Sequence, residues 1–243
     1  IMALVKPFSA YRPRKDIVSQ VAALPYDVYN RAEAKAEVET HPLSFLRIDR
    51  AETSFDDSVD TYAPCVYQKA KELLDSMIAN GEYIKEKQDI YYIYELTMNG
   101  RHQTGIVACA SIDDYENGII KKHENTREDK ELDRINHVDI CNAQTGPIFL
   151  AYRAVSEIDS VVSRICEGKP EYDFISEDGI GHRVWLIADS ADICTIRDGF
   201  SAMNHIYIAD GHHRAASAVK VGIKRRKGNP AHRGDEEYNY FLS

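Results

Sequence analysis

The sequence lacks the features that mark several classes of protein. Its five cysteines are odd in number and widely spaced, and none form the C-x-x-C pair typical of zinc and dithiol sites. No run approaches the roughly 20 apolar residues that a membrane helix requires. The segment 1–8 is too short, and too interrupted by Lys6 and Pro7, to act as a secretory signal. We therefore expect reduced, inert cysteines and a cytoplasmic protein with no membrane partner.

An excess of positive charge is also absent. The chain has 30 Lys and Arg against 39 Asp and Glu, which gives a net charge of -9. A protein that binds nucleic acid needs a basic face to displace counterions from the phosphates. The charge balance therefore argues against a nucleic-acid partner, although it leaves room for a local basic site that binds a smaller anion.

What is present is typical of a folded domain, with 44% hydrophobic and 28% charged residues. Apolar residues at helical spacing alternate along the chain with short runs rich in tyrosine and isoleucine, a pattern that predicts a mixed α/β fold. Asn99-Gly100 indicates a tight hairpin. Helices are predicted at 31–39, 66–77, 156–168, 214–221 and from 126 onward, and strands at 43–48, 89–96, 103–110, 148–152, 183–188 and 205–209.

The helix predicted from Thr126 onward carries two more specific expectations. Asp129 is placed for a capping box at its start. Leu132, Ile135 and Val138 recur at helical spacing, so we expect them to form the buried stripe.

Two further segments are predicted to be loops or turns. The segment 224–230 is basic and rich in helix breakers, which favours a solvated loop. The glycines at 179 and 181 lack the third glycine and the preceding strand of a dinucleotide fingerprint, so they are predicted to form a turn.

The end of the sequence, 238–243, has a strand pattern with no cap or polar tail after it. We expect the 243 residues to form one α/β domain that is the N-terminal part of a longer protein.

The strongest candidate site is the sequence Asp210-Gly211-His212-His213-Arg214, which lies between a predicted strand and a predicted helix. Glycine lets the backbone bend there, and free N–H groups at the start of a helix attract an anion. Arg214 can grip a phosphate with two parallel hydrogen bonds. Asp210 is suited to hold Mg²⁺, to orient a histidine or to act as a base, and the sequence leaves these three roles open.

A second cluster begins at His123-Glu124-Asn125-Thr126-Arg127. His123, Arg127 and Arg134, together with Lys130, recur close to one helical face and form a row that suits a polyanion. Acidic residues are interleaved with them, so an ordinary solvated helix laced with salt bridges fits the pattern equally well.

A third candidate is Asp27, in the segment Pro25-Tyr26-Asp27. Its carboxylate is suited either to cap the helix that begins near Arg31 or to take part in substrate binding.

Three motifs together resemble the bacterial and archaeal domain of unknown function family 1015, in the order in which that family has them. They are the segment 24–28 (Leu-Pro-Tyr-Asp-Val), the His123-Glu124-Asn125-Thr126 segment with Asp133-Arg134, and the segment 208–214 around Asp-Gly-His-His-Arg. The resemblance spans nearly the whole chain and implies that family members continue beyond residue 243.

The Asp-Gly-His-His-Arg turn is also similar to the phosphate-binding motif of the ParB and sulfiredoxin superfamily, which includes nucleotide-dependent free-serine kinases. This likeness implies a ParB/sulfiredoxin-like core with a mixed sheet and flanking helices. Sulfiredoxin chemistry is disfavoured because that motif carries a reactive cysteine where this chain has His212 and His213. A DNA-partition role fits poorly with the net charge.

The resemblance implies a phosphotransferase that uses ATP or ADP with Mg²⁺ to phosphorylate serine or a similar small hydroxylated metabolite. It assigns the phosphates to Gly211, His212, His213 and Arg214, with His123, Arg127 and Arg134 as further candidates, and it leaves Glu124, Asp27 and Asp210 as candidates for the catalytic carboxylate. Asp210 is the candidate metal ligand. Two alternatives use the same residues: a regulatory module that binds a nucleotide or phosphometabolite without chemistry, and a small-molecule phosphohydrolase.

Overall fold

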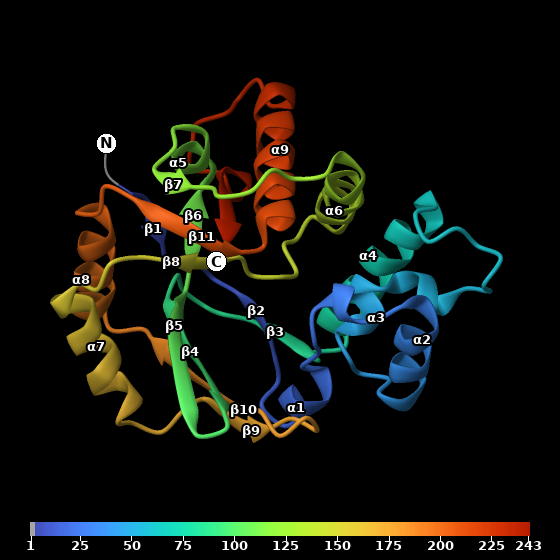
Figure 1. Ribbon diagram of the computed structural model, residues 1–243, viewed down its shortest axis with the longest axis horizontal. Coiled ribbons are helices and arrows are strands. Elements are labelled where there is room, and N and C mark those ends of the chain that lie inside the picture. Colours follow the sequence, from blue (N-terminus) through green and yellow to red (C-terminus); the bar gives the residue numbers. More distant parts are fainter. Residues whose placement is uncertain (1–2) are drawn as a thin grey trace.

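The computed structural model describes residues 3–243, apart from the side chain of Asp129, and it has the predicted mixed α/β architecture (Figure 1). Two hydrophobic cores organise it. One core lies in a helical lobe near the N-terminus, and the other fills a larger body of sheets and helices. No helix in the described part of the chain is long and apolar enough to cross a membrane.

The helical lobe packs around the apolar face of its longest helix, on which Val66, Ala70 and Met77 are buried at helical spacing. A capping box formed by Asn30 and Glu33 starts the preceding long helix, because each side chain binds the other residue's backbone N–H. The elements of the lobe are α1 (Val18–Val21), η1 (Tyr26–Val28), α2 (Arg31–Thr40), α3 (Leu46–Asp49), η2 (Ala51–Ser54) and α4 (Pro64–Ala79).

A four-stranded antiparallel sheet of order β5-β4-β10-β9 is the largest sheet in the described residues. The predicted hairpin is confirmed: Asn99 and Gly100 have φ of 52° and 75°, as a tight turn of this kind requires, and Met98 pairs with Arg101. The turn predicted around Gly179 joins the last two strands. The strands are β4 (Tyr91–Met98), β5 (Arg101–Val107), β9 (Tyr172–Ile175) and β10 (Gly181–Ile187).

Three smaller sheets complete the strand framework. In one of them β11 pairs parallel to β7 and antiparallel to β8, so this sheet is mixed. The sheets are β1-β6-β12 (Val5–Lys6, Cys109–Ser111, Tyr240–Leu242), β7-β11-β8 (Ile120–Lys121, Ile206–Asp210, Phe149–Ala151) and β2-β3 (Tyr11–Pro13, Tyr83–Lys85).

Helices cover the body on two sides (Figure 1). α7 and α8 pack together on one side, and on the other α6 stands between α9 and α4 of the helical lobe. Because Cys141 at the end of α6 belongs to the core of the lobe and α6 also packs against α9, this helix connects the lobe to the body. The remaining elements are α5 (Ile112–Glu116), α6 (Glu128–Cys141), α7 (Ser156–Cys166), α8 (Ser190–Ser201), α9 (His212–Gly228) and η3 (Glu237–Asn239).

The strand predicted at 43–48 is wrong, because this segment turns into the short helix α3. The Ser44 hydroxyl accepts a hydrogen bond from the N–H of Leu46 and so closes a turn, and Ile48 enters the core of the lobe. A short apolar run can suit a strand or a buried helix equally well, and here the local hydrogen bond decides.

The loop predicted at 224–230 is also wrong over most of its length, since α9 runs on to Gly228. Lys224 and Arg225 both pair with Asp139 of α6, and Arg226 pairs with Asp113 of α5. These ion pairs give the basic residues partners, and positive charge at the C-terminal end of a helix is favourable.

The apolar stripe predicted for α6 is wrong as well. Leu132 is 57% exposed, whereas Glu131, Arg134 and His137 are buried. The sequence rule fails because this helix packs its polar residues against specific partners on both sides. The capping role predicted for Asp129 falls on a side chain outside the described part of the structure.

Close packing at Gly222 of α9 makes the first prediction. A Cβ there would collide with the carbonyl oxygen of Tyr238 and lie 2.7 Å from Cδ1 of Ile112. We expect Gly222→Ala to lower the free energy of unfolding by about 1–3 kcal/mol in urea titrations, because overpacking forces backbone shifts. Gly228→Ala on the same helix meets open space and is the matched control. Equal stability of the two variants would contradict this packing.

Candidate functional site

The candidate site is built around the turn from β11 into α9. Gly211 is the N-cap of α9, has φ of 89° in the left-handed region and supplies no side-chain cap. The first hydrogen bond of the helix runs from the N–H of Ala215 to the oxygen of Gly211. The N–H groups of residues 212–214 therefore have no partner from within the helix, which is the arrangement that binds an anion at a helix start.

Arg214 folds back over this turn. One guanidinium nitrogen lies 2.9 Å from Oδ2 of Asp210, and another donates to the carbonyl oxygen of Pro147 at 2.7 Å. A Cβ on Gly211 would lie 3.1 Å from this guanidinium, and one on Gly146 would touch the same side chain at 3.5 Å. Two glycines therefore make room for the arginine, and its positive charge stays at the start of α9.

His212 and Glu124 connect the turn to the second motif. His212 is buried, and its Nδ1 lies 3.1 Å from Oε1 of Glu124, whose side chain is about half exposed. The ring of His123 packs edge-on against the ring of His212, with 4.4 Å between centroids. Burial lowers the pKa of His212, and the neighbouring His123 lowers it further while Glu124 opposes the shift. A neutral imidazole whose Nδ1–H donates to the carboxylate fits this geometry.

The same three side chains are able to hold a metal ion. His123, Glu124 and His212 each offer one ligand atom within 4.8 Å of the others. Two imidazoles and one carboxylate form the donor set of many catalytic zinc sites, in which three protein ligands leave a position open. Asp210, the predicted metal ligand, lies outside this cluster, and its carboxylate contacts Arg214.

His213 lies near Glu131, a buried carboxylate on α6. Hydrogen bonds from Lys220 and Thr126 lower the pKa of Glu131 against the effect of burial, and His213 adds to this shift. The hydroxyl of Ser217 donates to the backbone oxygen of Glu131 at 3.1 Å. Nδ1 of His213 and Nε2 of His212 are buried without a hydrogen-bond partner among the described residues. Buried polar atoms without a partner are uncommon in folded proteins.

The first motif reaches the same place through Tyr26. The guanidinium of Arg134 lies over the ring of Tyr26 at 4.0 Å from the centroid. Burial raises the pKa of this tyrosine, and the charges of Arg134 and Arg214 both counteract the shift. The next residue, Asp27, is exposed on η1. The first motif therefore contacts the second through Tyr26 and Arg134, and it lies within electrostatic reach of Arg214 in the third.

Arg134 itself is buried and neutralised by protein groups. It pairs with Asp133 at 2.8 Å and lies 4.0 Å from Asp49, an arrangement suited to supporting the site from within. Nε2 of His137, one turn further along α6, lies 3.1 Å from the backbone oxygen of Ile48. Burial lowers the pKa of His137, and the charge of Arg134 lowers it further.

The structure thus sorts the residues singled out from the sequence. His123, Glu124 and the turn 210–214 lie together. Arg134 is buried against the ring of Tyr26, and the next residue, Asp27, is exposed at the surface. Arg127 is the exposed N-cap of α6. Sequence reasoning missed Glu131, Lys220, Ser217 and the Gly146-Pro147 segment. Pro147 had no detectable signal, because it contributes only a backbone oxygen.

Comparison with protein families places the chain. The family model described as protein of unknown function (DUF1015) matches residues 5–243. The chain belongs to the DUF1015 family. No curated protein and no solved structure matches it. The family description names no activity, so the activity must be argued from the site.

Buried histidines make stability depend on pH, which is the second prediction. The pKa values of His137, His182 and His212 are lowered in the folded chain, so the unfolded chain binds more protons once the pH falls below about 6.5. Stability is therefore fully present above that pH and is lost as the pH falls through it. The raised pKa of His41 acts in the opposite direction.

We expect His137→Gln to make the plot of unfolding free energy against pH shallower between pH 6.5 and 5, by up to about 1.4 kcal/mol per pH unit. His205→Gln, at an exposed histidine, is the control. Parallel curves for wild type and His137→Gln in chemical denaturation would contradict the assignment.

Proposed function

We propose that this chain is a nucleotide-dependent phosphotransferase that transfers a phosphoryl group from ATP or ADP to serine or a similar small hydroxylated metabolite. The observation that carries the proposal is the glycine turn at the start of α9, where N–H groups without a partner within the helix lie beside the guanidinium of Arg214. The likeness of this turn to the phosphate-binding motif of free-serine kinases supports the choice of reaction.

Phosphoryl transfer makes limited demands on a protein. Positioning and charge neutralisation supply most of the catalysis, because the transferred group carries its charge on three oxygens. In the proposed complex the N–H groups of 212–214 bind the terminal phosphates, and Arg214 exchanges its contact with Asp210 for a phosphate oxygen. Asp210 is then free to bind the Mg²⁺ that accompanies the nucleotide.

Glu124 is the proposed base. Its carboxylate is held by the buried His212 and is open to solvent on its other side, so an acceptor hydroxyl is able to reach it. The acceptor proton passes to Glu124, the acceptor oxygen bonds to the terminal phosphorus, and the bond from that phosphorus to the bridging oxygen breaks to release ADP from ATP, or AMP from ADP. Asp27 is the alternative base, exposed beside Tyr26.

The third prediction tests the cradle. The chain is incubated with Mg²⁺, ATP or ADP, and a pool of small hydroxylated amino acids and metabolites, and products are followed by phosphorus NMR. We expect a new phosphomonoester signal. We expect Arg214→Gln to reduce its rate at least a hundredfold, and Arg214→Lys to restore little, because lysine lacks the planar fork.

Arg233→Gln is the matched control, since Arg233 also pairs with a neighbouring aspartate but lies at the surface and outside the turn. Free phosphate as the only product would support a phosphohydrolase instead. Saturable nucleotide binding without any product would support a regulatory module.

The fourth prediction tests the base. Glu124→Gln keeps the size of the side chain and a hydrogen-bond acceptor for His212, but it cannot take the acceptor proton. We expect its turnover to fall by about 100- to 10,000-fold while nucleotide affinity changes little. The turnover of Asp27→Asn is measured in parallel, and the nucleotide affinity of both variants is measured by isothermal titration calorimetry. If Asp27→Asn loses turnover and Glu124→Gln keeps it, the base is Asp27.

A further inference from the structure

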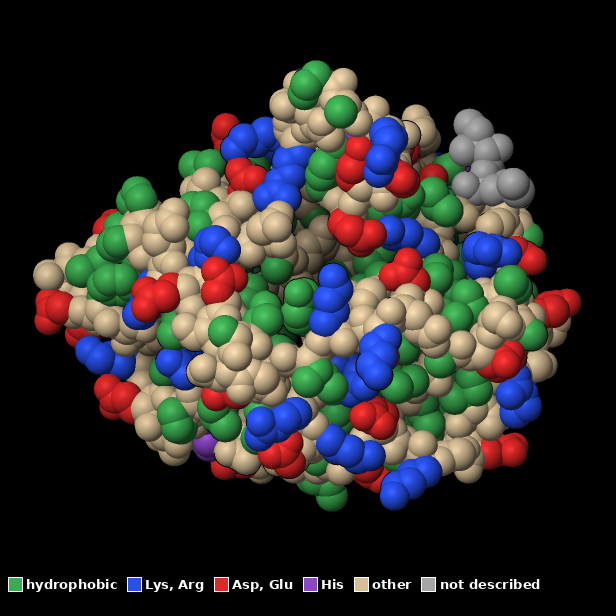
Figure 2. All heavy atoms as spheres, turned by 180° about the vertical axis from the view of Figure 1, so that it is seen from behind, with side chains coloured by type: hydrophobic (Ala, Val, Ile, Leu, Met, Phe, Trp, Pro, Cys, Tyr) green, Lys and Arg blue, Asp and Glu red, His purple; other side chains and the backbone are tan. Residues whose placement is uncertain are grey.

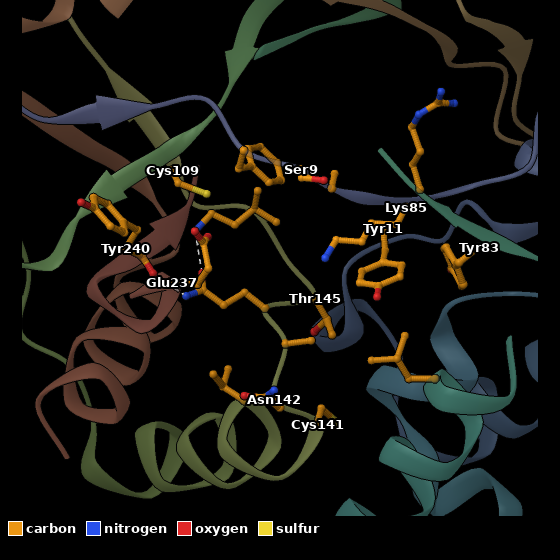
Figure 3. Close-up of a pocket in the computed structure, with 18 of the residues that line it drawn as sticks. Ser9, Tyr11, Tyr83, Lys85, Cys109, Cys141, Asn142, Thr145, Glu237 and Tyr240 are labelled. Atoms are coloured by element: carbon orange, nitrogen blue, oxygen red, sulfur yellow. Dashed lines mark hydrogen bonds between the residues drawn. The ribbon is translucent and has the colours of Figure 1, made fainter. Parts of the chain in front are cut away.

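A cavity lies outside the site described above. It has a volume of about 950 Å³, within the range of small-molecule pockets, and lies between the four-stranded sheet, α4 of the helical lobe, the end of α6 and α9 (Figure 3). None of the residues assigned to the phosphate turn, nor His123, Glu124 or Asp27, lines it. Seen from behind, the molecule is hollowed near the centre of its face, with Lys and Arg beside hydrophobic side chains (Figure 2).

Tyrosine is the most frequent residue type in the walls of this cavity. The chain has 15 tyrosines, and those that line the cavity come from strands on both sides and from the segment after α9. Tyrosine rings offer flat, rigid apolar surfaces that stack on a planar molecule at little entropic cost. The lining tyrosines are Tyr11, Tyr83, Tyr92, Tyr94, Tyr172, Tyr238 and Tyr240.

Most of the basic groups in the walls are already neutralised. Arg12 pairs with Glu86 at 2.9 Å, Lys71 with Asp75 at 2.7 Å, and Arg225 with Asp139 at 3.1 Å.

Lys85 differs from these cations. Among the described residues no carboxylate lies within ion-pair distance of its ammonium group, which points into the cavity beside the ring of Tyr11 at 5.5 Å from the centroid (Figure 3). An unpaired cation over an aromatic ring is prepared to bind a negatively charged group.

Tyr83, beside Lys85 in the wall, adds an independent observation. It is only 7% exposed, and its hydroxyl has no hydrogen-bond partner among the described residues, although burial raises its pKa and so keeps it protonated. The hydroxyls of Tyr92 and Tyr172, by contrast, bind backbone oxygens of Phe8 and Pro13. A buried donor without a partner is uncommon, and an acceptor group of a molecule in the cavity would satisfy it.

The opposite end of the cavity offers no free cation among the described residues that line it. Burial raises the pKa of the Cys109 thiol to about 12; the charge of Glu237 adds to this effect and that of Lys6 opposes it. Glu237 pairs with Lys6, and Cys109, Glu237 and Tyr240 lie across the cavity from Lys85 (Figure 3). An anionic group is therefore directed to the end with Lys85 and Tyr83.

We propose that this cavity binds a flat aromatic organic anion, with its ring system between the tyrosines and its negative group at Lys85 and Tyr83. The site does not depend on phosphotransfer at the turn before α9. Its ligand differs from a nucleoside triphosphate in needing an apolar planar body and one anionic group.

The test uses two fluorescent probes with nearly the same body. 8-Anilinonaphthalene-1-sulfonate carries a negative sulfonate, and N-phenyl-1-naphthylamine lacks it. We expect the sulfonate probe to bind the folded chain at one site, at least tenfold more tightly than the neutral probe. Lys85→Gln should weaken binding of the sulfonate probe about tenfold and leave the neutral probe unchanged, and Lys85→Arg should keep the affinity.

Three controls make the outcome decisive. Lys87→Gln removes a charge two residues away, at an exposed residue that does not line the cavity, and should change nothing. Tyr83→Phe should weaken only the sulfonate probe, about threefold to tenfold. Arg214→Gln should leave both probes unchanged, and thermal unfolding of each variant checks that it is folded.

The proposal is overturned if the sulfonate probe does not bind, if it binds Lys85→Gln as tightly as wild type, or if the neutral probe binds equally well. Loss of probe binding in Arg214→Gln would place the anion at the phosphate turn and would also overturn it. Failure of the phosphotransfer assay leaves these measurements unaffected, so the two proposals fail separately.

Discussion

The buried polar face of α6 is the constraint on which the rest of the structure depends. Removing Glu131, Arg134 and His137 from water is costly unless each finds a partner. Those partners come from both sides of the helix: Lys220 of α9 for the glutamate, and Asp49 and the Ile48 carbonyl of the helical lobe for the arginine and the histidine. The demand for these contacts fixes the lobe and the body against one helix more specifically than apolar packing does.

The candidate site inherits its geometry from this arrangement. Glu124 precedes α6 and the glycine turn precedes α9, so the packing of these two helices brings the carboxylate to His212. Tyr26 belongs to the lobe, and its ring packs against Arg134 of α6. Residues about 100 positions apart in the sequence therefore meet because α6 packs against both the helical lobe and α9.

Much of this could be predicted from the sequence, for physical reasons that differ from element to element. Helices with an apolar stripe, such as α4, and the Asn99-Gly100 hairpin follow local rules and are confirmed. The turn predicted at Gly211 between a strand and a helix is also confirmed, because the backbone freedom of glycine and the preferences at a helix start are local properties. The same reasoning fails for α6, because its buried face is polar and is stabilised by partners that lie far away in the sequence. The convergence at Tyr26 and the role of the Pro147 carbonyl depend on tertiary contacts that no spacing rule contains.

The segment after α6 contacts β12, the lobe and the arginine of the candidate site. Gln144 binds the backbone of Tyr240 and Leu242 in β12, Thr145 binds Asp49 of the lobe, and Pro147 accepts from Arg214. Gln144 and Thr145 also line the tyrosine cavity. These four hydrogen bonds all come from the stretch 144–147, so a substitution that shifts this short stretch of backbone would disturb β12, the lobe and the position of Arg214 together.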